Sequence, residues 1–224
     1  MRTHEYLIIG DSTYKSGCKV IGSSTSSTFA LKNKSILEVQ IPSYFNGAPI
    51  VEIGNNAFEN AKITKIFIPK TILFLGTECF DYCHELTEVR FEKGSQLEKL
   101  GKWVFFECSK LERIDIPASF RINGYPSNSI FTRAKALWCI SYLGSTDFSN
   151  SDFFNPLSDA PSNIRVSSLY PSDKLGRTTV TSRNGKTCGC SSEPFFKTRI
   201  ETIFIRRNRN SIFIVYIFHY FILK

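Results

Sequence analysis

The chain has 224 residues, a length that suits one domain or one domain with a tail. Hydrophobic residues make up 42% and charged residues 21%, an ordinary globular composition that excludes wholesale disorder. The net charge is +8, but residues 197–224 hold six basic residues and one acidic residue, which leaves an excess of only +3 on residues 1–196. Binding to nucleic acid needs a basic patch on the folded body, and this distribution argues against one.

The N-terminal segment, residues 1–35, shows no targeting signal. Its apolar stretch starts at Leu7 and is only four residues long, too short for the core of a secretory signal. We predict that residues 1–35 form a lead-in that caps the repeats that follow.

Residues 36–120 repeat themselves. Three windows align, IGNNAFENA from Ile53, LGTECFDYC from Leu75 and LGKWVFFEC from Leu100, and their Phe residues lie 22 and then 25 positions apart. A second block follows each window, and an additional copy of that block, ILEVQIPS, begins at Ile36. Periods of 20–29 residues with recurring aliphatic positions indicate a leucine-rich solenoid.

The second block predicts a short strand because its apolar residues alternate with polar ones, as in Ile66 and Ile68. A proline closes three of the four copies, where a missing N–H does least harm. Stacked coils should therefore form a parallel sheet on one face, with short helical or irregular segments on the other and with Phe58, Phe80 and Phe105 in the core. We predict an α/β leucine-rich-repeat solenoid.

The repeat resembles a known family. The pattern IG-x-x-AF-x-x-(A/C) followed by L-x-x-I-x-IP is similar to the BspA-like, or Treponema-type, leucine-rich repeat, and IPSYFNGAPIVEIGNNAF resembles the segment that opens such arrays. The resemblance implies a surface or host-contact protein that acts by binding, with no catalytic residues to carry over. It also implies a cell-surface location; without a signal peptide or a full-length transmembrane helix, the cytoplasm is the alternative.

Residues 121–192 lose the period and become rich in Ser, Asn and Pro. We interpret them as a degenerate C-terminal cap, which a solenoid needs because its last coil otherwise exposes an apolar end. Residues 136–142 and 163–168 could add two further strands. Asn184 and Gly185 predict a tight hairpin, since this pair supplies the positive φ values that such turns require.

The cysteines superficially suggest a zinc site, because Cys79, Cys83 and His84 lie close together and Cys108 follows one repeat later. The repeat explains them without metal, since each of these Cys occupies a slot for a small buried residue and the spacing matches no standard ligand set. Cys188 and Cys190 could bridge to another cysteine in an exported protein or stay reduced otherwise. The sequence also contains no motif of a known catalytic centre, so we expect no enzyme, cofactor or metal.

The tail, residues 193–224, is basic and apolar. As a helix, the apolar run at 212–223 would rise about 18 Å, too little to span a bilayer of about 30 Å. Three alternatives stay open: an interfacial membrane anchor in which Arg206, Arg207 and Arg209 meet anionic lipid, a strand pair or helix packing on the final coil, and translation past a frame change in AT-rich DNA. The lack of any clear periodicity favours the third.

The outward residues of the predicted strands form two columns. Glu38, Lys65, Glu88 and Arg113 alternate in sign, so neighbouring strands should pair opposite charges. The second column runs Gln40, Phe67, Arg90 and Asp115, and an outward aromatic residue flanked by Arg is typical of a binding hot spot.

We therefore predict a non-enzymatic module for a protein or glycan partner, such as a surface antigen or adhesin. Its contacts should centre on Phe67 and Arg90, with Lys65, Arg113 and Asp115 beside them. The alternatives are a vestigial or structural family copy and a membrane-peripheral scaffold held by the tail.

Overall fold

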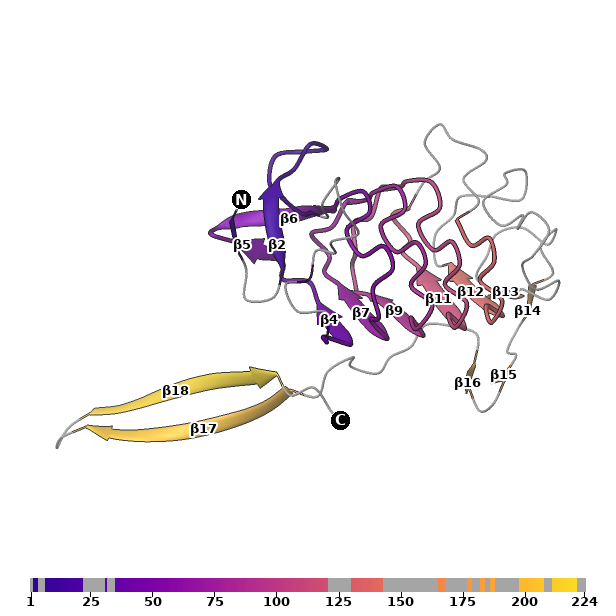
Figure 1. Ribbon diagram of the computed structural model, residues 1–224. Coiled ribbons are helices and arrows are strands. Elements are labelled where there is room, and N and C mark those ends of the chain that lie inside the picture. Colours follow the sequence, from indigo (N-terminus) through magenta and orange to yellow (C-terminus); the bar gives the residue numbers. More distant parts are fainter. Residues whose placement is uncertain are drawn as a thin grey trace. The chain divides into compact units, whose positions relative to one another are not determined.

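The computed structural model comprises two compact units, residues Met1–Cys190 and Ser191–Lys224. The structure describes residues 2–3, 7–21, 31, 35–120, 130–142, 165–167, 177–178, 182–183, 186–187, 198–207 and 211–220. Each unit is considered by itself below (Figure 1).

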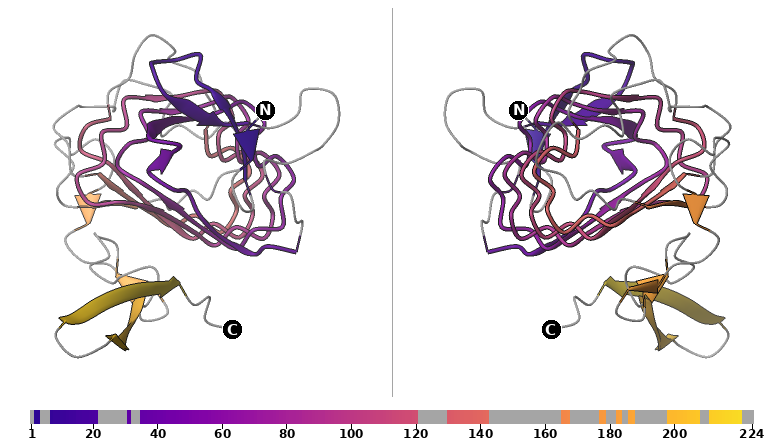
Figure 2. Two further views of the ribbon diagram at one scale, coloured as in Figure 1. Left: turned by 90° about the vertical axis from the view of Figure 1, so that its left-hand side faces the viewer. Right: turned by 90° about the vertical axis from the view of Figure 1, so that its right-hand side faces the viewer.

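The first unit is a solenoid whose second blocks form the predicted parallel sheet, here called the front sheet. Its seven strands all run parallel to their neighbours. In spatial order they are β14 (Arg177–Thr178), β13 (Arg165–Ser167), β12 (Cys139–Tyr142), β11 (Arg113–Ile116), β9 (Glu88–Phe91), β7 (Lys65–Ile68) and β4 (Glu38–Gln40). Seen end-on, the successive coils follow the same path around the solenoid axis (Figure 2).

A second sheet, here called the side sheet, lies where each coil enters the Gly-Phe window. Three strands, β6 (Ala48–Ile53), β8 (Phe74–Leu75) and β10 (Lys99–Leu100), pair in parallel. The lead-in joins the same sheet: β2 (Ile8–Asp11) pairs antiparallel with both β1 (Arg2–Thr3) and β3 (Cys18–Val20), and β3 pairs in parallel with β6. A short strand β5 (Tyr44–Phe45) turns back onto β6. The lead-in thus contributes directly to the sheet of the first coil.

The α/β description needs correction, because the described residues contain strands and turns but no helix. In the Gly-Phe window, residues four positions apart adopt positive φ, for example Asn56 at 55° and Asn60 at 58°, a conformation that interrupts a right-handed helix. Alternate N–H groups donate to the next coil instead of to their own: Phe58 N–H to the carbonyl oxygen of Cys79 at 2.8 Å, and Phe80 N–H to that of Val104 at 3.1 Å. The turns are therefore tied together across coils, which satisfies backbone groups that a helix would pair internally.

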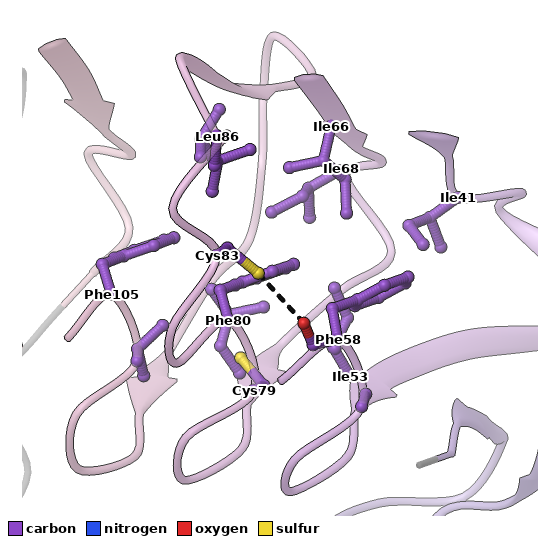
Figure 3. Close-up of a cluster of buried hydrophobic side chains, with 14 of the residues drawn as sticks. Ile41, Ile53, Phe58, Ile66, Ile68, Cys79, Phe80, Cys83, Leu86 and Phe105 are labelled. Atoms are coloured by element: carbon purple, nitrogen blue, oxygen red, sulfur yellow. Dashed lines mark hydrogen bonds between the residues drawn. The ribbon is translucent and has the colours of Figure 1, made fainter. Parts of the chain in front are cut away.

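The core is organised around a ladder of phenylalanine rings. Phe58, Phe80 and Phe105 are fully buried, as predicted, and Figure 3 shows them one coil apart. Their rings are nearly parallel, with centroids 5.4 Å apart between Phe58 and Phe80 and 5.5 Å apart between Phe80 and Phe105. A fourth ring, Phe131, continues the ladder 5.7 Å beyond Phe105. The regular coil therefore extends past residue 120, the end of the array expected from the sequence.

Two further predictions for residues 121–192 are confirmed. Strands β12 and β13 fall within the two segments expected to extend the sheet. The hairpin around Asn184 and Gly185 forms from β15 (Ser182–Arg183) and β16 (Lys186–Thr187), with Arg183 paired to Lys186.

The second unit contains an antiparallel pair, β17 (Thr198–Arg207) and β18 (Ser211–Tyr220), in continuous register from Thr198↔Tyr220 to Arg207↔Ser211. A strand pair was part of one of the three alternatives left open for this tail, and β17 and β18 form such a pair. Ile, Phe, Tyr and Val favour strands, and pairing along ten residues does not require a clean apolar alternation. In the part of the chain that the structure describes, no helix is long and apolar enough to cross a membrane.

Candidate functional site

The first outward column of the front sheet forms as the sequence predicts. Glu38 lies beside Lys65, Lys65 beside Glu88, and Glu88 beside Arg113 on successive strands. All four side chains are half-buried. The Lys65 ammonium lies 3.1 Å from Oε1 of Glu38, so this neighbouring pair is an ion pair. Such pairs contribute only about 0.2–1 kcal/mol each, enough to favour this register without fixing the surface rigidly.

The second column brings Gln40, Phe67 and Arg90 side by side on β4, β7 and β9. Phe67 is half-buried rather than fully exposed. In the structure, Nε of Arg90 donates to Oε1 of Glu88, two residues earlier on its own strand, at 2.5 Å.

Arg113 is held in the same way. Its Nη2 donates to both carboxylate oxygens of Asp115 at 3.1 Å, again two residues along one strand. The guanidinium groups are therefore oriented by carboxylates within their own strands. The front sheet presents a partly exposed aromatic ring among oriented charges of both signs.

Two of the three arginines considered for membrane contact, Arg206 and Arg207, lie at the end of β17, and their backbones pair with Ile212 and Ser211. Arg209 lies outside the described residues.

The cysteines of the array behave as small buried residues. Cys79, Cys83 and Cys108 are fully buried and are free thiols. Sγ of Cys83 donates to the carbonyl oxygen of Phe58 at 3.0 Å, drawn as a dashed line in Figure 3, and Sγ of Cys108 makes the equivalent contact with Phe80 at 3.2 Å. Burial raises the pKa of each of these three thiols well above its ordinary value, which suppresses the reactive thiolate.

The structure does not assemble the zinc ligands that the sequence superficially suggested. His84 is exposed, and its Nδ1 lies 3.0 Å from the carbonyl oxygen of Glu107. Among the described residues, no group of three or more His, Cys, Asp or Glu side chains is placed to hold a metal ion. Cys139 is disulfide-bonded, whereas Cys188 and Cys190 lie outside the described residues.

Two features of the turns are not predicted by the sequence. Asp81 is 7% exposed, and in the described part of the chain its Oδ1 has no hydrogen-bond partner. Burial, reinforced by the charge of Glu78, raises the pKa of Asp81 to about 7. In the repeat alignment Asp81 directly follows Phe80, and the sequence alone indicates neither that its side chain is buried nor that its Oδ1 lacks a hydrogen-bond partner.

The second feature is a cluster of aromatic residues on the turn surface. Tyr82 and Trp103, 36% and 44% exposed, both contact the ring of Phe106, at centroid distances of 5.7 Å and 6.4 Å. Trp103 has a positive φ of 53°, a strained conformation for a bulky residue. The sequence shows these residues only as variable positions of the window.

The comparisons with known proteins agree on the repeat. A family model described as a BspA type leucine rich repeat region matches residues 13–136 and 51–158, with six copies. The crystal structure of the T. pallidum leucine rich repeat protein TpLRR is similar with a TM-score of 0.55 and 18% identity, covering 79% of this chain and 80% of that one. At this identity the likeness shows the fold, a leucine-rich-repeat solenoid.

A leucine-rich repeat protein from Bacteroides capillosus is similar with a TM-score of 0.45 and 24% identity, over 57% of this chain and 88% of that one. No curated protein matches the chain.

Proposed function

The chain belongs to the BspA-type leucine-rich repeat family, and we propose that it is a non-enzymatic binding module whose front sheet contacts a protein or glycan partner. The observation that carries the proposal is the second outward column, in which Phe67 lies between polar neighbours on two adjacent strands. Repeat proteins use extended sheet faces of this kind for binding without any chemistry.

The surroundings of Phe67 suit a binding hot spot. Aromatic and arginine side chains contribute most to interfaces when a ring of weaker contacts excludes water around them. Arg90 is pre-oriented by Glu88, so less conformational entropy is lost when a partner binds to its guanidinium group. Lys65, Arg113 and Asp115 lie around this centre and would form the rim.

We place a cell-surface antigen or adhesin role within this proposal. Membership of the family supports this role. The front sheet also supports it, because its seven strands form an extended face that a macromolecular partner could contact.

The test begins with labelled wild-type protein on an array of immobilised glycans and extracellular-matrix proteins. Surface plasmon resonance on the strongest hit then compares the wild type with the Phe67→Ala/Arg90→Ala double variant. We expect affinity to fall at least tenfold while the melting temperature stays nearly unchanged. The matched control is Glu85→Ala/Lys110→Ala, which removes an exposed ion pair of 2.6 Å outside the front sheet and should bind like the wild type.

The alternatives predict other results. Full affinity in the double variant would show that the columns only hold the sheet together. No specific hit on the array would favour a vestigial or structural family copy, and binding that requires only residues 193–224 would favour a scaffold held by the tail.

A further inference from the structure

The side sheet carries a hollow that the front-sheet proposal does not use. Its volume is about 470 Å³, within the range of about 300–1,000 Å³ typical of small-ligand pockets. It is lined by the lead-in and by the entrance of the first three coils, and it lies entirely within the described residues.

One wall of the hollow is a column of side chains across four parallel strands. Lys19 lies beside Glu52, Glu52 beside Phe74, and Phe74 beside Lys99. The ammonium group of Lys99 lies over the Phe74 ring, 5.7 Å from its centroid. Because side chains alternate across a strand, this column points away from the core that Ile53 occupies with its neighbours.

Asn55, Thr77 and Lys102 also line the hollow, and each of them follows the glycine of its coil. Gly54 and Gly101 line it as well. Gly101 cannot be replaced by a larger residue without moving the coils, because a Cβ there would lie 2.4 Å from the backbone nitrogen of Thr77.

The charges of the hollow favour an anion. Three lysines, Lys19, Lys99 and Lys102, face a single acid, Glu52, which gives a net charge of +2. Glu52 is only 3% exposed, and its carboxylate accepts hydrogen bonds from the Ser12 hydroxyl at 2.7 Å and from the Thr13 N–H at 3.1 Å. The acid is thus committed to holding the lead-in, and the lining residues carry more positive than negative charge.

We propose that this hollow binds an acidic saccharide, with its carboxylate or sulfate group at Lys99 and Lys102. The hydroxyl and amide groups of Thr13, Asn55 and Thr77 are suited to the hydroxyl groups of a sugar ring, and ammonium groups are suited to its anionic substituent. The site is separate from Phe67 and Arg90 and does not depend on the function proposed for the front sheet.

The experiment is isothermal titration of the full chain with a sulfated, uronate-containing disaccharide prepared from heparin. Maltose serves as a neutral disaccharide of the same size, and sodium sulfate as the anion alone. We expect the acidic disaccharide to bind at least tenfold more tightly than either of the others, with affinity falling as salt is raised. The Lys99→Ala/Lys102→Ala variant should lose at least tenfold in affinity, and Lys99→Arg/Lys102→Arg should recover most of it.

One control variant separates this site from the rest of the molecule. Lys62→Ala/Lys110→Ala removes two exposed lysines outside the hollow and should bind the acidic disaccharide like the wild type. Unchanged affinity in Lys99→Ala/Lys102→Ala with an unchanged melting temperature would overturn the proposal, and so would equal binding of maltose or of free sulfate.

Discussion

Truncation of Phe80 is the sharpest test of the coil register. Its ring is fully buried between Phe58 and Phe105, at centroid distances of 5.4 Å and 5.5 Å. Phe→Ala changes in cores cost about 3–5 kcal/mol, and each stacked aromatic pair adds about 0.5–1.5 kcal/mol beyond buried area. Because Phe80→Ala loses two such pairs and leaves a cavity between rigid coils, we expect a loss near the upper end, about 4–5 kcal/mol.

Urea unfolding followed by circular dichroism measures this loss. With a dependence of about 2 kcal/mol per molar urea, the midpoint should fall by roughly 2 M. Phe80→Leu keeps much of the side-chain volume and should shift the midpoint less than half as far. Lys110→Ala removes only an exposed ion pair and should cost no more than about 1 kcal/mol. If Phe80→Ala shifted the midpoint no further than Lys110→Ala does, the stacked core would be refuted.

Three further predictions follow from the buried acid, the thiols and the tail. Because folding raises the pKa of Asp81 from 3.8 to about 7, the folded state binds this proton more tightly than the unfolded chain does, and the free energy of unfolding should fall as pH rises from about 4 to 7. Urea titrations at several pH values should show this fall in the wild type and not in Asp81→Asn. A flat wild-type profile would contradict the prediction. Iodoacetamide should not label Cys79, Cys83 and Cys108 in the folded protein but should label them in urea, as measured by mass spectrometry. Labelling of Cys139 should require a reductant in addition to urea. Rapid labelling of the three thiols in the folded protein would contradict their burial. If the tail contacts membranes, deleting residues 206–224 should abolish sedimentation with anionic liposomes, and high salt should weaken it beforehand; equal sedimentation with and without the tail would exclude that contact.

The periodicity of the sequence predicted the front sheet and the core because both leave a direct trace in it. Alternation at Ile66 and Ile68 marks which side chains point inward, and the recurring Phe marks one position per coil. Once the copies are aligned, the register of the two outward columns follows, and the structure has Phe67 beside Arg90 as expected.

The turns were harder to predict because they carry little local signal. Asn56, Glu78 and Trp103 adopt left-handed backbone conformations without glycine, so the sequence does not distinguish these turns from a helical segment. The hydrogen bonds that stabilise them reach the next coil, and single-coil reasoning does not include such contacts.

The side sheet and the tail show two other limits. Strands β8 and β10 are two residues long, too short for any alternation to show. The column formed by Lys19, Glu52, Phe74 and Lys99 becomes apparent only when the coils are stacked. In the tail, the order comes from pairing between β17 and β18 rather than from a pattern within either strand. At the front sheet, the hydrogen bond from Arg90 to Glu88 depends on side-chain rotamers, which the alternation of apolar and polar residues does not specify.

Photo-crosslinking from position 67 tests the proposed binding face most directly. Phe67 is replaced by benzoyl-phenylalanine, which keeps the aromatic ring, and the complex with the strongest array hit is irradiated and mapped by mass spectrometry. The same replacement at Phe106, on the turn surface, is the control. We predict a crosslink to the partner from position 67 and none from position 106. A partner that crosslinks from position 106 and not from position 67 would contradict the assignment of binding to the front sheet.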